Sequence, residues 1–198
     1  MGDFTRDFTG ERIGVFQKFR YNGKRTTRKE RHMFEINIIK GTKPTGNPVI
    51  HERLAVRAVI RENGKLLMVE TNRGDYKFPG GGVEAGETKE EALLREIREE
   101  TGYVDITPGD CIVVAYEENE DTEEAGTWFQ MKSIYYECNI NSHKRAPGIQ
   151  DDYEEKLGFH GVFVTVKEAL AKNRALAKQY TFEEIPWLER ETKVLERL

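Results

Sequence analysis

Residues Gly81–Tyr103 read GGVEAGETKEEALLREIREETGY. This stretch opens on glycines, and Thr88 followed three residues later by Glu91 forms a capping box, a pairing typical of helix starts. Apolar residues then recur at helical spacing as far as Ile97, and Gly102 is the residue type that most often ends a helix. The segment therefore predicts a glycine-rich loop that leads into an amphipathic helix.

Three carboxylates gather on one side of this expected helix. At about 100° per residue, Glu96, Glu99 and Glu100 fall within about a third of the circumference. Leu93 and Ile97 occupy the adjoining arc, so the acids lie beside the buried stripe. Three anions at this spacing repel one another unless a cation lies between them, and hard divalent ions with oxygen ligands meet that need. The helix therefore predicts a Mg²⁺ site that also handles substrate phosphate.

A Glu- and Arg-rich helix taken alone is more typical of a solvated face with i,i+4 ion pairs. Three features favour the catalytic interpretation instead: the triple-glycine entry, the capping box, and the placement of Glu87 and Arg95 at fixed intervals.

The spacing resembles the signature of the Nudix hydrolase family, G-x5-E-x7-R-E-U-x-E-E-x-G-U. Every fixed glycine and charged position of that signature is present between Gly81 and Gly102. The one departure is Tyr103, which stands where the family usually has an aliphatic residue. Seven fixed positions, each with a background frequency of roughly 5–10%, match by chance on the order of 10⁻⁵ or less. The motif is therefore a specific signal.

The resemblance implies a role for each residue of the motif. Glu96, Glu99 and Glu100 would bind Mg²⁺ or Mn²⁺ with the backbone carbonyl of Gly80, and Glu99 and Glu100 are the expected catalytic carboxylates. Arg95 and Glu87 would stand behind these ligands, because a guanidinium can hold carboxylates in a bidentate fork. The two glycines of the motif, Gly81 and Gly102, would have structural roles.

The reaction that the resemblance implies is the attack of water on one phosphorus of a diphosphate. In relatives, the base that takes the proton is often a glutamate on a loop before the last strand, although some use a helix glutamate. Asp151, Asp152, Glu154 and Glu155 are the candidates, and we choose Glu155 because it lies close to the start of that strand. Each acid taken singly also fits a solvated loop residue.

Strand signals surround the helix. Leu54–Ile60 and Lys65–Val69 are apolar runs joined through Asn63-Gly64, a pair that supplies the positive φ angles of a type I′ hairpin turn. Further strands are expected over Tyr76–Phe78, Cys111–Glu117, Thr127–Cys138 and Gly158–Val164, and further helices from Thr165 to about Lys172 and over Pro186–Leu198. The fold class is α+β, with the α/β/α sandwich that the resemblance implies: a mixed sheet between helices, plus an N-terminal β extension.

A length of 198 residues favours one domain with an extension. We expect a Nudix domain with C-terminal helices over residues 51–198 and an extension over residues 1–50. Within the extension, Arg12–Tyr21 and Phe34–Ile39 are expected to form a hairpin that could support a homodimer. The basic stretch Asn22–His32 separates them, and an acidic connector is expected over Glu117–Gly126.

Composition excludes several classes of protein. The net charge of −4 argues against broad nucleic-acid binding. No apolar run approaches the roughly 18–20 residues that cross a bilayer, and the first residues carry no apolar signal segment. Cys111 and Cys138 are isolated and are expected to be free thiols, so the cytoplasm is the expected compartment.

Three functions stay open. The first is hydrolysis of a small, nucleotide-like diphosphate, with ADP-ribose, oxidised nucleoside triphosphates and dinucleoside polyphosphates as candidate substrates. The second is a non-catalytic nucleotide sensor or RNA-binding module that keeps the fold. Loss of a motif glutamate would favour it, and none is lost. The third is RNA decapping or end processing, which depends on the basic stretch.

Overall fold

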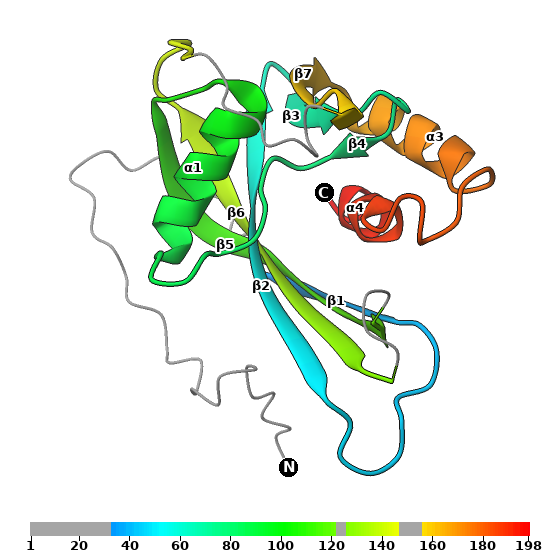
Figure 1. Ribbon diagram of the computed structural model, residues 1–198. Coiled ribbons are helices and arrows are strands. Elements are labelled where there is room, and N and C mark those ends of the chain that lie inside the picture. The colour runs from blue at the N-terminus through cyan, green and yellow to red at the C-terminus, as the bar shows by residue number, and fades with distance from the viewer. Residues whose placement is uncertain (1–32, 122–125, 147–155) are drawn as a thin grey trace. The chain divides into compact units, whose positions relative to one another are not determined.

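The computed structural model describes residues 33–121, 126–146 and 156–198 (Figure 1). Three sets of predictions lie outside these residues: the strand over Arg12–Tyr21, the basic stretch Asn22–His32 and the four base candidates Asp151, Asp152, Glu154 and Glu155.

Seven strands and three helices make up the described part of the chain. The strands are β1 (Phe34–Ile39), β2 (Ile50–Glu62), β3 (Lys65–Glu70), β4 (Tyr76–Lys77), β5 (Ile106–Glu120), β6 (Trp128–Ile140) and β7 (His160–Val164). The helices are α1 (Lys89–Thr101), α3 (Val166–Leu176) and α4 (Leu188–Leu195).

The strands form one mixed sheet in the order β1-β5-β6-β2-β3-β4, and β7 also pairs with β3. Two pairings are parallel, β1 with β5 and β2 with β6. The other pairings, including the long ribbon of β5 and β6, are antiparallel. A parallel pairing needs a long crossover, and here the segment between β2 and β6 contains the glycine-rich loop and α1.

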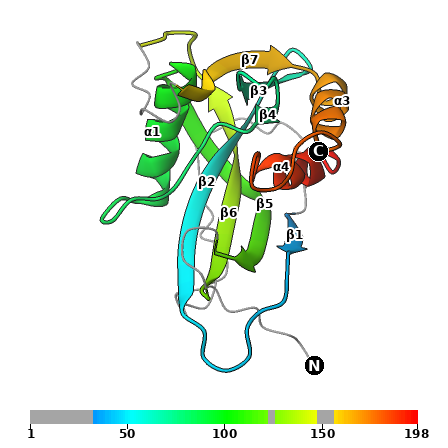
Figure 2. The ribbon, with the colours of Figure 1, turned by 45° about the vertical axis from the view of Figure 1, so that its right-hand side comes forward.

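The helices cover both faces of the sheet (Figures 1 and 2). On one face, Leu93 and Ile97 of α1 pack against Val56, Ala58 and other residues of the sheet. On the opposite face, apolar side chains of α3 and α4 enclose a second core with residues of the same strands. The prediction of an α+β fold with a mixed sheet between helices is therefore confirmed.

The predicted hairpin is confirmed as the connection between β2 and β3. Arg61 pairs with Leu66 and Glu62 with Lys65 across the turn. Asn63 has φ of 49° and Gly64 has φ of 76°, the two positive angles that the Asn-Gly pair predicts.

The acidic connector was predicted too long. The structure places Glu117 inside β5, which continues to Glu120. Glu117 is buried, and its ion pair with Arg190 of α4 makes that burial tolerable. No local sequence pattern reveals this partner.

β1 occupies the predicted range Phe34–Ile39, and its partner among the described residues is β5. In the described ranges, no helix has both the length and the apolar character needed to cross a bilayer.

Candidate active site

The helix that carries the motif is fixed at both ends. Thr88 accepts a hydrogen bond from the backbone N–H of Glu91, and the Glu91 side chain accepts one from the backbone of Thr88. Gly102 ends the helix with φ of 78°, a left-handed conformation that favours glycine. Both ends match the prediction, so the position of each carboxylate along α1 is set by local sequence.

The three motif carboxylates differ in burial. Glu100 is 2% exposed and Glu96 is 8% exposed, whereas the side chain of Glu99 is 27% exposed. Burial raises the pKa of Glu100, and the nearby ammonium of Lys77 opposes that rise. Burial also raises the pKa of Glu99, against the opposing effect of Arg95. The negative charge of Glu96 also raises the pKa of Glu99 and of Glu100, as like charges at this spacing do.

Arg95 lies at the centre of the motif. Its Nε and Nη2 donate to the two oxygens of Glu87 at 2.8 and 3.0 Å, which is the expected bidentate fork. Its Nη1 donates to Glu96 at 2.8 Å and to Glu99 at 3.1 Å, and its Nη2 also donates to the carbonyl of Gly82. The fork lowers the pKa of Glu87. Arg95 therefore joins the glycine-rich loop to two of the three carboxylates.

The glycine-rich loop lies directly on β2. The backbone N–H of Ala58 donates to the carbonyl of Pro79 at 2.8 Å, and that of Val56 donates to the carbonyl of Gly81 at 2.9 Å. Gly80 makes two further bonds, since its N–H donates to Glu100 at 2.8 Å and its carbonyl accepts from Arg57 at 2.8 Å. The loop therefore holds Gly80 against Glu100, the last of the three carboxylates along α1.

Lys77 belongs to this site and was not predicted from the sequence. Its ammonium forms a buried ion pair with Glu100 and lies 4.2 Å from the centre of the Phe159 ring. Lys77 stands between two aromatic residues in a short strand, and nothing in that local pattern indicates a partner on α1. The same holds for Arg57, whose contact with Gly80 spans 23 positions of the chain.

The chemical types of the expected metal ligands fit a hard divalent cation. They are carboxylate oxygens and a backbone carbonyl, the ligands that Mg²⁺ prefers. A Cβ on Gly81 would lie 2.4 Å from a carboxylate oxygen of Glu96, so this glycine leaves room for that group. In the described ranges, however, no three acidic, cysteine or histidine side chains are grouped closely enough to hold a metal. Arg95 and Lys77 are instead the cations paired with these acids.

Substitution by alanine is expected to have different effects at the neighbouring residues Gly80 and Gly81. A Cβ on Gly80 would lie 2.1 Å from the Val56 carbonyl oxygen, and its φ of 143° is strained for any other residue. We expect Gly80→Ala to lower the free energy of unfolding by at least about 2 kcal/mol. Gly81→Ala meets only side-chain atoms of Glu96, which would have to shift from their contact with Arg95, so we expect a smaller loss of stability than at Gly80 and weaker Mn²⁺ binding. Urea unfolding and Mn²⁺ titration of both variants measure this, and equal losses of stability would contradict it.

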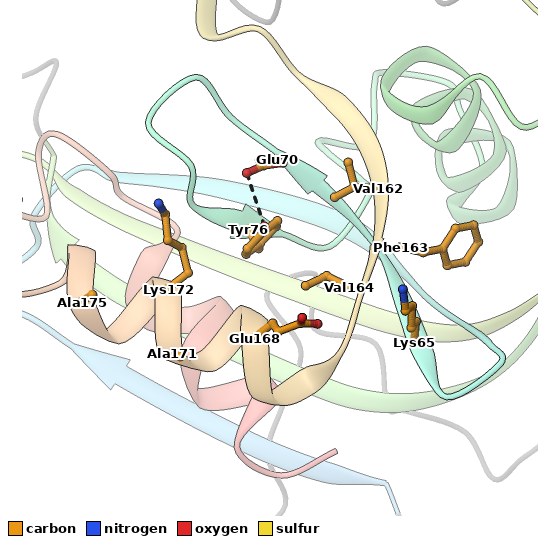
Figure 3. Close-up of a pocket in the computed structure, with 10 residues that line it drawn as sticks. All are labelled: Lys65, Glu70, Tyr76, Val162, Phe163, Val164, Glu168, Ala171, Lys172 and Ala175. Atoms are coloured by element: carbon orange, nitrogen blue, oxygen red, sulfur yellow. Dashed lines mark hydrogen bonds between the residues drawn. The ribbon is translucent and has the colours of Figure 1, made fainter.

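A groove between β7 and α3 lies apart from the carboxylates (Figure 3). Charged residues of both signs line it, with Lys65 and Lys172 offset by Glu70 and Glu168. Tyr76 donates to Glu70 within it at 3.3 Å. None of its lining residues belongs to the motif, so the groove does not extend this site.

Comparisons with known proteins agree on the family. A family model described as NUDIX domain matches residues 51–187. Nucleoside triphosphatase NudI of Enterobacter sp. is 32% identical over 113 residues, which are 54% of this chain and 80% of that protein. ADP-ribose pyrophosphatase of Methanocaldococcus jannaschii is 42% identical over 59 residues, which are 28% of this chain and 35% of that protein.

Among solved structures, an ADP-ribose pyrophosphatase from Streptococcus suis aligns with a TM-score of 0.42 at 17% identity, covering 58% of this chain and 75% of that one. The chain spans between 16% and 37% of the length of four curated relatives that it matches, the Methanocaldococcus protein among them. The family match nevertheless covers more than half of the chain and includes the whole motif. The chain belongs to the Nudix family.

Proposed function

We propose that this chain is a Mg²⁺- or Mn²⁺-dependent hydrolase that cleaves the diphosphate linkage of a nucleotide-like substrate. One observation carries the proposal. Glu96, Glu99 and Glu100 all lie on α1, Glu100 accepts a hydrogen bond from the backbone N–H of Gly80, and Arg95 contacts Glu87, Glu96 and Glu99 at once.

In this proposal, Glu96, Glu99, Glu100 and the carbonyl of Gly80 hold the cation. When bound, it supplies a Lewis acid that lowers the pKa of water and offsets the charge on the leaving phosphate. Arg95 keeps Glu96 and Glu99 oriented, because one guanidinium nitrogen reaches both. Water attacks one phosphorus, the bond to the bridging oxygen breaks, and a proton passes to a base.

Glu155 remains our proposed base, and it lies outside the described residues. It precedes β7, the strand that pairs with β3, in the sequence. Lys77 has a different part in the proposal. The ammonium opposes the effect of burial on Glu100, so it favours the ionised carboxylate that a metal ligand requires.

The substrate class follows from the names of relatives, which point in two directions. One relative is an ADP-ribose pyrophosphatase and another is a nucleoside triphosphatase. Both activities break a phosphoanhydride bond, so the shared chemistry supports a nucleoside diphosphate derivative or a nucleoside triphosphate as substrate. A sensor that binds without turnover is the alternative, and the intact motif argues against it.

A panel of diphosphates tests the proposal. The purified chain with Mg²⁺ or Mn²⁺ is incubated with ADP-ribose, dinucleoside polyphosphates and oxidised and ordinary nucleoside triphosphates in ¹⁸O-water. We expect cleavage of the diphosphate linkage of at least one compound, with one ¹⁸O in one of the two products, and no cleavage after addition of a chelator. Binding of these compounds without any product would contradict the hydrolase and indicate a sensor.

A further inference from the structure

A buried ionic cluster lies on the face of the sheet opposite α1. It consists of Arg57, Glu117, Tyr135, Arg190 and Glu191, here called the α4 cluster because its last two members belong to α4. Arg190 is 2% exposed and Glu191 is fully buried. Charges so deeply buried are costly unless they are paired, so this cluster needs an explanation.

The pairing within the cluster is nearly complete. Arg190 forms an ion pair with Glu117 and donates from Nε and Nη2 to one oxygen of Glu191 at 3.0 and 2.9 Å. Tyr135 donates to the same oxygen at 3.3 Å. Two guanidinium groups and two carboxylates balance, so the cluster carries no net charge. Arg57 is the exception: its buried Nε has no hydrogen-bond partner among the described residues and lies 3.5 Å from Glu191.

The cluster reaches the glycine-rich loop at two points. The second oxygen of Glu191 accepts a hydrogen bond from the backbone N–H of Phe78 at 3.3 Å. Nη1 of Arg57 donates to the carbonyl of Gly80 at 2.8 Å. Both backbone groups of Gly80 are therefore held: Glu100 of α1 accepts from its N–H, and Arg57 of the α4 cluster donates to its carbonyl.

Gly80 needs such external support. Its φ of 143° lies in the region that only glycine adopts readily, so ordinary backbone preferences do not fix its carbonyl. A carbonyl oxygen has two lone pairs, and the bond from Arg57 uses one of them. The other remains for a metal ion. Moreover, α4 begins at Leu188, just beyond the residues 51–187 that the family match covers.

We propose that Arg57 and Glu191 are positioning residues through which α4 fixes the orientation of the Gly80 carbonyl. Glu191 holds Phe78 directly and draws the guanidinium of Arg57 toward α4, while Arg57 holds the carbonyl. This inference rests on the proposed function, in which that carbonyl binds the divalent cation. It assigns α4 a part in the site through two buried residues, one of which, Arg57, lies outside that helix.

Two variants separate positioning from folding. Arg57→Met combined with Glu191→Gln removes one positive and one negative charge, so no uncompensated charge stays buried. Arg57→Lys keeps the positive charge but loses the fork that serves both partners. Glu189→Gln is the matched control, because Glu189 also lies in α4 but pairs at the surface with Lys40 and Lys193.

The direct readout is the Gly80 carbonyl itself. The sequence contains Gly-Gly pairs only at positions 80–81 and 81–82. Protein labelled with [1-¹³C, ¹⁵N]glycine therefore gives two amide-to-carbonyl NMR correlations, one of which reports the Gly80 carbonyl. We expect this signal to move in the double variant and in Arg57→Lys, and to stay in place in Glu189→Gln.

Binding and kinetics complete the test. We expect about a 10–100-fold loss of Mn²⁺ affinity and of kcat in the double variant, with the substrate KM little changed, and a smaller loss in Arg57→Lys. An unmoved Gly80 signal with parental Mn²⁺ affinity would overturn the proposal, as would failure of both variants to fold, which would make the cluster purely structural. If the parental chain neither binds Mn²⁺ nor hydrolyses any substrate, the proposed function fails. The NMR signal of the Gly80 carbonyl still decides whether Arg57 and Glu191 hold that carbonyl.

Discussion

Glu99→Gln abolishes turnover in our account and leaves the midpoint of thermal unfolding unchanged or raised. Glutamine keeps the shape of the side chain and an oxygen that can accept from Arg95, but it lacks the charge that a divalent cation requires. Changes behind a metal ligand cost about 10–100-fold, so loss of a ligand charge should exceed about 100-fold.

The expected stability follows from the pKa of Glu99, which burial raises. A raised folded-state pKa means that folding favours the protonated carboxyl, so ionisation at neutral pH costs stability. Glutamine does not carry that cost. Glu90→Gln, on the exposed first turn of α1, is the control and should keep the parental rate. Parental turnover in Glu99→Gln, measured on the best substrate of the panel, would show that the assigned ligand is wrong.

Lys77→Met should lower the free energy of unfolding strongly, and a divalent cation should restore much of the lost stability. Removing the ammonium leaves the buried carboxylate of Glu100 without its paired cation. Breaking a buried ion pair from one side typically costs about 3–5 kcal/mol. We therefore expect a loss of that order in chelator, measured by urea unfolding at neutral pH.

Restoration of stability by metal distinguishes a metal site from an ordinary buried ion pair. If Glu100 binds Mg²⁺ or Mn²⁺, the ion compensates the charge that Lys77 no longer offsets, so added metal should raise the stability of Lys77→Met more than that of the parent. Lys65→Met, an exposed lysine of β3, controls for the loss of a positive charge. An equal effect of metal on Lys77→Met and the parent would remove Glu100 from the proposed ligands.

Local chemistry allowed much of this fold to be predicted. The Asn-Gly turn between β2 and β3 and both ends of α1 depend on residues within four positions of one another. Their partners are therefore visible in the sequence. The capping box at Thr165 likewise starts α3, although that helix continues to Leu176, beyond the predicted end.

Contacts between distant segments could not be predicted. Glu117 was predicted at the junction of a strand and an acidic connector, and its ion pair with Arg190, 73 positions away, was not predicted. Lys77 and Glu100 are separated by 23 positions and approach only because the loop folds back on β2. Charge and hydropathy patterns report which side chains can be buried, but they do not identify the partner that makes burial tolerable.

The carboxylates of α1 show the same limit. Their mutual repulsion was predicted from helical spacing; the pKa values of Glu99 and Glu100 are raised mainly by burial, and the charge of Glu96 adds to that rise. Arg95 was expected to hold carboxylates, but the sequence did not reveal that Lys77 would pair with Glu100. The ligand roles, the base Glu155 and the homodimer remain predictions.

Anomalous diffraction from crystals soaked with Mn²⁺ and a non-hydrolysable diphosphate analogue tests the central claim most directly. We expect manganese peaks within bonding distance of Glu96, Glu99 and Glu100, with the analogue's bridging phosphates on the same ions. Peaks elsewhere, with these three side chains still paired only to Arg95 and Lys77, would contradict the account.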